Sequence, residues 1–385
     1  MNLQFSDGNQ LQLLNSGSAY FPALITAIDA AQIVVYLETY IFAGDETGRA
    51  VVAALVRAAG RGVAVHLLVD GFGSKDMPAP MRQELLDAKV QVLLYNPKIS
   101  PFALQRRSLR RMHRKLAVID RRLALVGGIN IIDDIVTSSH PHPRCDYAIS
   151  IEGPLVVTIE AEAVRLWRRV AWVNFRWRWR HKEFVPASTV LGKQRAALVV
   201  RDNLLHRFDI EEAYFAAIEQ AKEEIIIANA YFFPGRRFRR ALRRAVERGV
   251  RVVLLLQGRR EYILFHYATR ALYGSLLEAG VEIYEYHKSF MHAKVAVIDQ
   301  HWATVGSSNI DPFSLMLARE ANIVVDDLAF AAELRDSLYG SIAEGAQLLE
   351  KTSWYRQPLW RRLFIWIAYG LTRLALGLVV NGWSH

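Results

Sequence analysis

Four polar residues that can act together on an anionic group occur twice in this chain, in the same order and at the same spacing. The first set is His113, Lys115, Asp120 and Asn130, and the second is His292, Lys294, Asp299 and Asn309. Each member of the second set lies 179 positions after its counterpart. Imidazoles can attack or transfer protons, while lysine and amide groups can bind an anion. Two complete sets favour a duplicated catalytic site over buried structural histidines beside surface lysines.

Both sets lie in the same local pattern, which predicts a strand, a turn and a second strand. The strings at 112–120 and 291–299 each run from Met-His through Lys into apolar residues that end at Asp. Side chains two positions apart in a strand share a face, so each His should point the same way as its Lys. The apolar run after each Lys predicts a buried strand. We count Asp120 and Asp299 with the catalytic motif, but at strand ends we expect them to bond to the backbone.

The Gly-rich turns at 127–130 and 306–309 complete a resemblance to the phospholipase D superfamily. The signature of that superfamily, H-x-K-x-x-x-x-D followed by a Gly-rich turn and Asn, stands here twice and complete. The resemblance covers residues 8 to 350. It implies an α/β fold of two sandwich halves, related by a pseudo-twofold axis, that share one active site.

A phosphodiester explains why such a site would need both sets. Its negative charge repels nucleophiles, so the site must neutralise the phosphate oxygens and protonate a poor leaving group. Lys115 and Lys294 can supply positive charge, and we expect Asn130, Asn309 and Ser307 to bind the same phosphate. One imidazole would attack phosphorus to form a phosphohistidine, while the other donates a proton and later accepts one from an alcohol. We expect no metal and no other cofactor, because two lysines supply the charge.

Each imidazole should also be oriented by a carboxylate on its second nitrogen. The candidates are Asp146 and Glu320, which both precede apolar alternating stretches, and the resemblance implies an acid at about these places. A near-symmetric pair does not show which His attacks. The resemblance leans to the first, so we assign His113 as nucleophile and His292 as acid and base. We interpret the lone Cys145 as a packing residue.

The length and the repeat divide the chain into two α/β halves. Its 385 residues, 52% of them hydrophobic, allow two domains with substantial cores. Apolar runs at 33–40 and 225–231 precede the two tetrads, with helical segments at 48–60 and 238–249. We place the first half at 1–182, a connecting segment at 183–195, the second half at 196–350 and a tail at 351–385.

The charge and the tryptophans indicate an anionic partner. The formal net charge is +10, and a run from Asn96 to Lys115 without any acidic residue leads into the first tetrad. Arg and Trp alternate within 165–182, which suits a membrane headgroup interface. The same residue types would also stack on bases and contact a nucleic-acid backbone. This segment alone leaves both partners open.

The tail favours a membrane. Residues 363–380 are apolar apart from Thr372 and Arg373, and Arg373 shares a helical face with Arg362 and Tyr369. A charged residue at mid-span is costly, so we expect an amphipathic helix that lies in the membrane interface without crossing it. The alternative is an amphipathic helix docked on the protein's own core. Without an export signal or disulfides, we expect peripheral association with the cytoplasmic side of the cell membrane.

Within the superfamily, the chain resembles the bacterial cardiolipin synthases of the short type that lacks N-terminal membrane spans. The segments that carry this resemblance are 8–14, Leu37-Glu38-Thr39-Tyr40 and 110–115. The resemblance implies transfer of a phosphatidyl group from one phosphatidylglycerol to another, with release of glycerol. The expected partners are therefore this anionic phospholipid and a membrane surface, bound through 165–182 and the tail. No nucleic acid and no obligate protein partner is expected.

Three alternatives stay open from the sequence. The first is a phospholipase D that hydrolyses phospholipids to phosphatidic acid. The second is a nuclease of the same superfamily, which the charge favours and the tail disfavours. The third is a membrane-binding protein of the same fold without enzymatic activity, against which the two intact tetrads argue.

Overall fold

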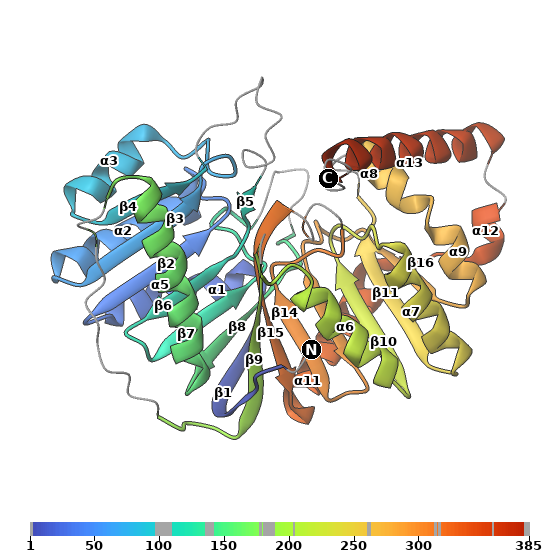
Figure 1. Ribbon diagram of the computed structural model, residues 1–385, viewed down its shortest axis with the longest axis horizontal. Helices are drawn as coiled ribbons and strands as arrows, with labels where there is room; N and C mark the ends of the chain where they lie inside the picture. Colours follow the sequence, from blue (N-terminus) through green and yellow to red (C-terminus); the bar gives the residue numbers. More distant parts are fainter. Residues whose placement is uncertain are drawn as a thin grey trace.

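The structure, a computed structural model, describes residues 3–96, 110–134, 142–176, 179, 189–202, 205–259, 263–311, 314, 317–355 and 358–380. Two α/β halves lie side by side, and strands from both halves join one sheet (Figure 1). The predicted class, an α/β fold of two repeated halves, is confirmed. One sheet runs without interruption across the boundary between the halves. The sequence did not predict this continuous sheet.

The first half places its strands in the order β4, β3, β2, β6, β7, β8 and β1, from the outer edge inward. The outer three strands are parallel to one another, and the following pairs are antiparallel. The strands are β1 (Ser6–Asn15), β2 (Val34–Thr39), β3 (Ala64–Asp70), β4 (Gln91–Tyr95), β6 (Leu116–Ile119), β7 (Leu123–Gly127) and β8 (Tyr147–Glu152).

The second half repeats this topology. Its order from the outer edge inward is β12, β11, β10, β13, β14, β15 and β9, with β16 added outside β12. The strands are β9 (Gln194–Arg201), β10 (Glu224–Asn229), β11 (Arg251–Gln257), β12 (Glu282–Tyr286), β13 (Lys294–Ile298), β14 (Trp302–Gly306), β15 (Ala318–Asp326) and β16 (Ala346–Leu348). The two tetrads therefore occupy equivalent hairpins, β6–β7 and β13–β14, as the repeated strings predicted.

Among the described residues, two pairs of strands join the halves. β1 pairs antiparallel with β9, through Ser6 with Ala196 and Asn9 with Gln194. β9 begins at Gln194, so the second half starts inside the segment 183–195 that we expected to connect the halves. β5 (Arg111–Met112), from the first half, pairs in parallel with β15 of the second half. This crossing pair brings the first tetrad against the second half.

Among the described residues, the three largest hydrophobic cores fill the space between the sheet and its helices. One lies under the outer helices of the first half and one under those of the second. The third takes buried side chains from both halves together with α5 and α11, so it fixes the two tetrads relative to each other. The helices are α1 (Ser16–Ala30), α2 (Glu46–Gly60), α3 (Ala79–Asp87), α5 (Leu155–Val173), α6 (Asp209–Gln220), α7 (Arg236–Glu247), α9 (Tyr273–Glu278) and α11 (Leu328–Gly345).

Local sequence explains where several elements begin. The carboxylate of Asp45 accepts the backbone N–H of Gly48 at 2.9 Å and caps α2. Asp327 caps α11 in the same way, through Phe330. Such caps satisfy backbone donors that a helix leaves unpaired at its first turn. Every residue of β2 and of β10 is buried, as expected for strands covered on both faces.

The Trp/Arg segment 165–182 is not a continuous membrane surface. Trp167 is only 1% exposed, and its ring stacks on that of Trp179, with 6.3 Å between the centroids. The prediction that this segment faces a membrane is therefore wrong for Trp167, because the helical turn of α5 directs this residue into the shared core. Trp172 is 66% exposed. Trp177 lies outside the described residues.

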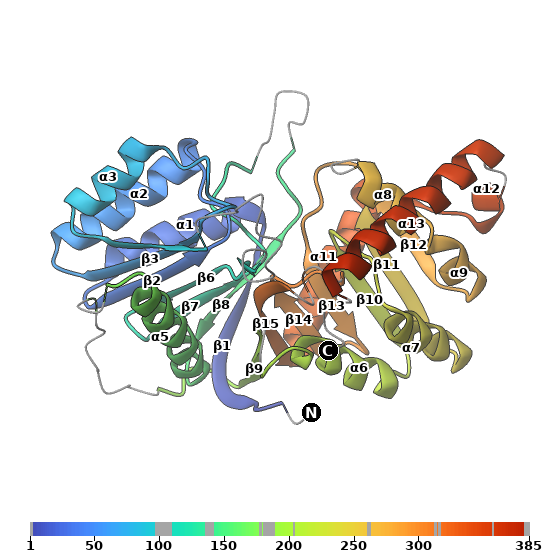
Figure 2. The ribbon, with the colours of Figure 1, turned by 45° about the horizontal axis from the view of Figure 1, so that its top comes forward.

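The tail forms α12 (Lys351–Tyr355) and α13 (Leu359–Val380), and α13 lies along α8 (Ile263–Arg270) on the second half (Figure 1 and Figure 2). One face of α13 docks on the protein through the buried residues Ile365, Ala368 and Thr372. The opposite face exposes apolar side chains, namely Leu363, Trp366, Ile367, Leu371 and Leu374. One face of the tail is therefore docked on the protein, as in the alternative interpretation, and contact of the other face with a membrane stays a prediction. Over the part of the chain that the structure describes, no helix has the length and apolarity needed to cross a bilayer.

Candidate active site

The backbone brings each catalytic histidine against the opposite half. The N–H of His113 donates to the carbonyl of Arg319 at 2.9 Å, as an extension of the β5–β15 pair. The N–H of His292 donates to the carbonyl of Cys145 at 2.8 Å, beside a parallel bridge between Cys145 and Met291. The repeated topology thus produces the same crossed arrangement twice.

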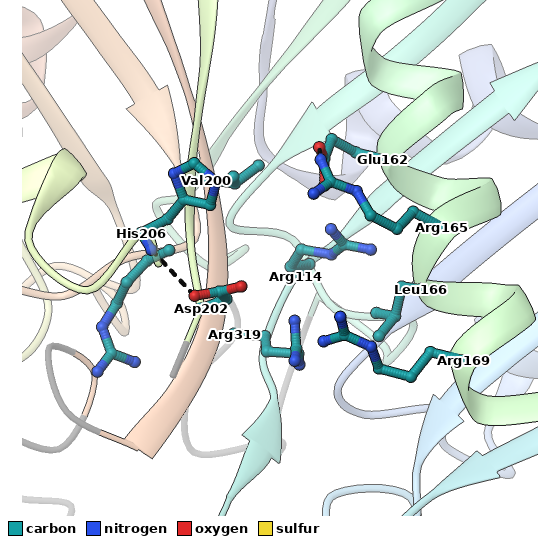
Figure 3. A pocket seen from close by; sticks show the side chains of 10 residues that line it. Arg114, Glu162, Arg165, Leu166, Arg169, Val200, Asp202, His206 and Arg319 are labelled. Atoms are coloured by element: carbon teal, nitrogen blue, oxygen red, sulfur yellow. Dashed lines mark hydrogen bonds and ion pairs between the residues drawn. The ribbon is translucent and has the colours of Figure 1, made fainter. Parts of the chain in front are cut away.

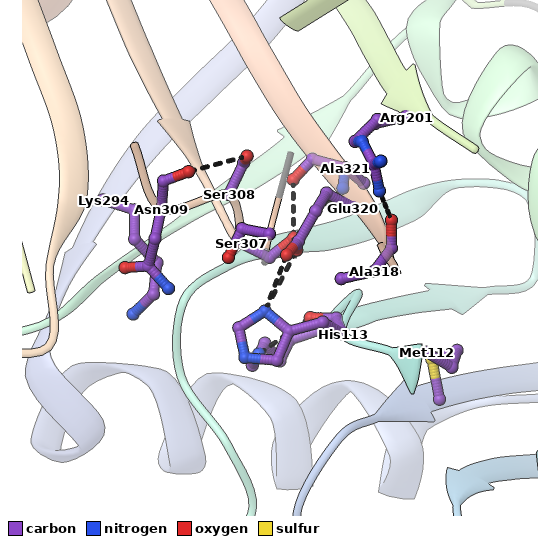
Figure 4. A network of polar contacts seen from close by, with 12 residues as sticks. Met112, His113, Arg201, Lys294, Ser307, Ser308, Asn309, Ala318, Glu320 and Ala321 are labelled. Carbon is purple, nitrogen blue, oxygen red and sulfur yellow. Dashed lines mark hydrogen bonds and ion pairs between the residues drawn. The ribbon is translucent and has the colours of Figure 1, made fainter. Parts of the chain in front are cut away.

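Each imidazole meets a carboxylate that comes from the other half. Nδ1 of His113 lies 3.0 Å from both carboxylate oxygens of Glu320 (Figure 4). Nδ1 of His292 lies 2.6 Å from Oδ2 of Asp146. A carboxylate on Nδ1 holds that nitrogen protonated and leaves the lone pair on Nε2. The two acids that the sequence nominated for orienting the histidines are therefore both in contact with imidazoles.

Both lysines of the tetrads are buried beside their histidines. Nζ of Lys115 donates to the carbonyl of His113 at 2.7 Å. Nζ of Lys294 contacts the carbonyl of His292, lies 2.8 Å from Nδ1 of that ring and lies 3.9 Å from Asp146. Burial lowers the pKa of Lys115 to about 7. A bound anion would favour the charged form of this lysine again.

The two half-sites act on each other electrostatically, as one site requires. Burial lowers the pKa of His113, and the charge of Lys294, which belongs to the other half, lowers that pKa further. Burial and the charge of Lys294 lower the pKa of His292 to about 3, and Lys115, which belongs to the other half, also lowers it. Burial favours the neutral form of Asp146, but attraction to Lys294 and His292 outweighs it and lowers the pKa of that carboxyl. The lysines therefore disfavour imidazolium at both histidines.

The three expected phosphate-binding residues, Asn130, Asn309 and Ser307, differ in their hydrogen bonds. Oδ1 of Asn130 accepts a hydrogen bond from the backbone N–H of Ile41 at 3.1 Å. The amide nitrogen of Asn130 takes no part in this bond. Oδ1 of Asn309 is buried and has no hydrogen-bond partner among the described residues. The hydroxyl of Ser307 donates to Glu320 at 2.6 Å, so its proton is committed to the carboxylate. The phosphate contact that we expected for Ser307 would require this bond to break.

Gly128 occupies the position of the first half that corresponds to Ser307. A side chain there would place Cβ 2.2 Å from Oδ1 of Asp146, so only glycine leaves room for that carboxylate. The two equivalent turns thus interact differently with the carboxylates beside them. Gly128 makes space for Asp146, whereas Ser307 donates a hydrogen bond to Glu320.

Asp120 and Asp299 lie at the far ends of their hairpin strands and bond to the backbone. The carboxylate of Asp120 accepts three consecutive N–H groups, those of Gln32, Ile33 and Val34, at 2.7 to 2.8 Å. Asp299 does the same with residues 222–224. Both residues have a positive φ, near 50°, which Asp tolerates better than most side chains. This geometry gives both aspartates a structural role, as we expected from their position at strand ends.

Two further contacts of the site were missed from the sequence. The ring of Tyr40 lies 4.8 Å from that of His113 and 5.5 Å from Nζ of Lys115. Arg114 lies between His113 and Lys115 in the sequence, but its side chain turns away from them. It forms a buried ion pair with Glu38 through two hydrogen bonds of 2.8 Å. The string Leu37-Glu38-Thr39-Tyr40 carried the signal, because it precedes the tetrad on the neighbouring strand.

Two other sequence predictions concern the surroundings of the site. Most of the basic run between Asn96 and Lys115 lies outside the described residues, which resume at Arg110. Cys145 is buried, and burial raises the pKa of its thiol to about 12. The thiolate form that a nucleophile needs is therefore scarce at neutral pH.

Two histidine–carboxylate pairs with buried lysines, at the seam of two α/β halves, define an enzyme site of the phospholipase D type. A family model described as "Cardiolipin synthase, PLD-like domain" matches residues 24–141 and 214–339. Cardiolipin synthase B of Escherichia coli (strain K12) is 41% identical over 384 residues, which cover 100% of this chain and 92% of that protein. The major cardiolipin synthase ClsA of Bacillus subtilis (strain 168) is 29% identical, over 96% of this chain and 75% of that protein.

A solved structure also shares the fold. The crystal structure of phosphatidylserine synthase from Haemophilus influenzae Rd KW20 matches with a TM-score of 0.75 at 13% identity, over 98% of this chain and 97% of that one. The chain belongs to the cardiolipin synthase family of phospholipase D-like proteins. The resemblance inferred from the tetrads is thereby confirmed.

Proposed function

We propose that this protein is a cardiolipin synthase that transfers a phosphatidyl group from one phosphatidylglycerol to another and releases glycerol. The observation that carries the proposal is the pair of crossed contacts, His113 with Glu320 and His292 with Asp146, in a chain that belongs to this family. Covalent transfer needs two groups of this kind, one to hold phosphorus and one to move protons.

In the first step, Nε2 of His113 attacks the phosphorus of one phosphatidylglycerol. We assign this role to His113 because its Nδ1, among the described residues, bonds to the oxygens of Glu320 alone, whereas Nδ1 of His292 is also contacted by Lys294. The bond from phosphorus to the glycerol oxygen breaks, and imidazolium at His292 gives its proton to that oxygen. Glycerol leaves, and phosphatidyl remains on His113. The negative phosphodiester is what favours imidazolium at His292, because it offsets the charge of Lys294.

In the second step, the free hydroxyl of another phosphatidylglycerol takes the place of glycerol. His292 accepts the hydroxyl proton as the oxygen attacks phosphorus, and the bond to His113 breaks. Cardiolipin is released, and both imidazoles return to their starting states. Lys115 and Lys294 neutralise the phosphate charge throughout, with the amide groups of Asn130 and Asn309 as further donors. Ser307 keeps Glu320 in place and takes no direct part.

Transfer prevails over hydrolysis only if a lipid hydroxyl outcompetes water at the phosphohistidine. A membrane supplies that hydroxyl at high effective concentration. We propose that the exposed face of α13, with Trp366, Leu371 and Leu374, lies in the bilayer interface while its other face stays on the protein. The association is peripheral, and the cytoplasmic side of the cell membrane remains our prediction.

The experiment that tests this function offers the purified protein two substrates in parallel. Labelled phosphatidylglycerol in mixed micelles should yield cardiolipin and free glycerol. Labelled single-stranded DNA should remain intact. Phosphatidic acid as the main product would establish a phospholipase D that hydrolyses, and cut DNA would establish a nuclease. If neither substrate turns over, the protein is a binding protein of this fold.

A further inference from the structure

Asp70, the last residue of β3, is a buried acid that the proposed reaction does not use. It is 0% exposed. Oδ1 accepts the backbone N–H groups of Phe72 and Gly73 at 2.9 and 3.0 Å, and Oδ2 accepts that of Met112 at 2.8 Å. Met112 directly precedes His113. The carboxylate of Asp70 therefore ties the end of β3 to the strand β5 that leads into His113.

Gln257 occupies the equivalent position of the second half. It ends β11, as Asp70 ends β3, and it pairs with the last residue of β12, as Asp70 pairs with the last residue of β4. Oε1 of Gln257 accepts the backbone N–H of Arg259 at 3.1 Å, and Nε2 donates to the carbonyl of Met291 at 3.2 Å. Met291 directly precedes His292. In each half, a side chain at the same place holds the residue before the catalytic histidine.

The two side chains do this with different chemical groups. A carboxylate only accepts hydrogen bonds, whereas an amide accepts with its oxygen and donates with its nitrogen. Asp70 thus receives the N–H of Met112, and Gln257 donates to the carbonyl of Met291. A buried charge is costly, and a neutral group could also accept one N–H. The negative charge of Asp70 therefore calls for a reason beyond the support of the backbone.

The charge of Asp70 acts on Lys115. Burial lowers the pKa of Lys115 to about 7, and the charge of Lys294 acts in the same direction. Three carboxylates oppose this effect by favouring the ammonium form, namely Glu320, Asp146 and Asp70. Glu320 and Asp146 are bonded to the catalytic histidines. Asp70 is the one of these three acids that acts on the lysine without bonding to an imidazole among the described residues.

The groups around Asp70 and Lys115 leave this interaction in place. Burial raises the pKa of Asp70, but its three N–H donors and the charge of Arg111 oppose this effect and favour the carboxylate. The ring of Tyr40 also faces Nζ of Lys115, at 5.5 Å. Arg114 points to the other side of the extended chain, where it lines a hollow beside α5 (Figure 3).

We propose that Asp70 is a positioning residue for the reaction proposed above, on which this inference rests. Its carboxylate holds the backbone of Met112, and with it the imidazole of His113. The same carboxylate gives the first half-site a negative charge that keeps Lys115 in its ammonium form. Gln257 holds the backbone in the second half but supplies no charge. The two half-sites are therefore unequal because of residues outside the repeated tetrads.

The pH dependence of kcat/KM with a soluble nitrophenyl phosphodiester tests this role. This readout does not depend on which lipid product the enzyme makes, so its outcome is separate from that of the product assay. In Asp70→Asn, the amide oxygen can still accept the N–H groups of Phe72 and Gly73, while NH2 replaces the oxygen that faces Met112. Asp70→Ser is a second variant without the charge, and its hydroxyl can accept a backbone N–H in the same turn.

We expect the alkaline decline of kcat/KM to begin at lower pH in both variants, because loss of a negative charge lowers the pKa of Lys115 further. We also expect kcat to fall by roughly tenfold as His113 loses its backbone support. In the Lys115→Arg background, Asp70→Asn should lower kcat without moving the pH profile, since a guanidinium stays charged.

Two further variants separate charge from structure. Gln257→Met keeps the length of the side chain but loses the contact with Met291, so it should lower kcat and leave the alkaline decline in place. Asp327→Asn makes the same chemical change as Asp70→Asn at a carboxylate that caps α11, and it should match the wild type.

An alkaline decline at the wild-type pH in folded Asp70→Asn and Asp70→Ser would overturn the proposal. An equal shift in Gln257→Met would do the same, because that variant changes no charge. If urea unfolding and circular dichroism show that neither Asp70 variant folds, Asp70 serves folding and the proposal is also overturned.

Discussion

Nδ1 of His113 lies 3.0 Å from both carboxylate oxygens of Glu320, although 207 positions and the boundary between two halves separate these residues in the chain. His292 and Asp146 form the reciprocal contact from the opposite direction. Neither half therefore contains a complete histidine–carboxylate pair. The duplication creates two working pairs only because the halves pack against each other through β5 and β15.

The Glu320→Gln substitution tests the contribution of this contact. An amide cannot stabilise a developing positive charge on the imidazole, so we expect kcat to fall by roughly 100-fold with little change in KM. The control Ser307→Ala removes one hydrogen bond that positions Glu320 and should lower kcat by less than about tenfold. Steady-state rates with phosphatidylglycerol in mixed micelles measure both. Wild-type kcat in Glu320→Gln would show that Glu320 does not orient a reacting group.

The sequence was sufficient to predict the repeated hairpins, because the strings at 112–120 and 291–299 combine strand periodicity with identical polar positions. It also located Asp146 and Glu320 as acids that precede apolar stretches, at about the places where the resemblance implies an acid. It did not show that each acid serves the histidine of the other half, since that depends on how β5 crosses to β15. Long-range pairing leaves no local pattern in the chain.

Side-chain roles that depend on packing were harder to predict. Alternation of Arg and Trp suggested an interface for 165–182, but Trp167 packs in the core. Its spacing of four from Ala163 and three from Val170, which are both buried on α5, was the signal that indicated a core face. The sequence predicts a phosphate contact for Ser307, but the hydroxyl of this residue donates to Glu320 in the folded protein.

Trapping of the covalent intermediate tests which imidazole attacks. A phosphodiester with a nitrophenolate leaving group needs no protonation, so His292→Ala should still form the phosphohistidine and release about one equivalent of nitrophenolate per enzyme. Without a base for the incoming alcohol, the intermediate should then persist and be found on His113 by mass spectrometry. His113→Ala should give no burst. A burst in His113→Ala and none in His292→Ala would reverse the assignment.

The pH dependence of kcat/KM should reflect Lys115, whose pKa is lowered to about 7 by burial. Below this pH the free enzyme carries the ammonium that binds phosphate, and above it the neutral amine predominates. We therefore expect kcat/KM to decline above about pH 7. In the complex, the anionic substrate raises the pKa of Lys115, so kcat should persist to higher pH.

Lys115→Arg provides the control for this profile, because a guanidinium stays charged throughout the measured range. Its activity is expected to be lower, but the alkaline decline of kcat/KM should disappear. An unchanged alkaline limb in Lys115→Arg would mean that another group titrates there.

Asp120→Ala separates structure from chemistry within the motif. The carboxylate of Asp120 accepts three backbone N–H groups before β2, so its removal should lower the free energy of unfolding by about 1–3 kcal/mol. Urea unfolding measures this loss, and Asp299→Ala should behave alike. Activity per folded molecule should remain near wild type. A large loss of kcat in fully folded Asp120→Ala would return this residue to the catalytic group.

The exposed face of α13 should determine membrane binding. Because three apolar side chains would leave the bilayer interface, Trp366→Ser/Leu371→Ser/Leu374→Ser should bind phosphatidylglycerol vesicles roughly 100-fold more weakly in sedimentation assays. Turnover of a soluble phosphodiester should be unchanged, since the catalytic residues lie on other elements.

The matched control changes three exposed apolar residues elsewhere, Phe72, Leu86 and Leu328, to serine. It removes apolar surface without touching the tail, so vesicle binding should stay at the wild-type level. A tail-deletion variant lacking residues 355–385 should match the α13 triple variant. If all three variants sediment with vesicles like the wild type, the protein binds membranes through another surface, and α13 serves only to cover the second half.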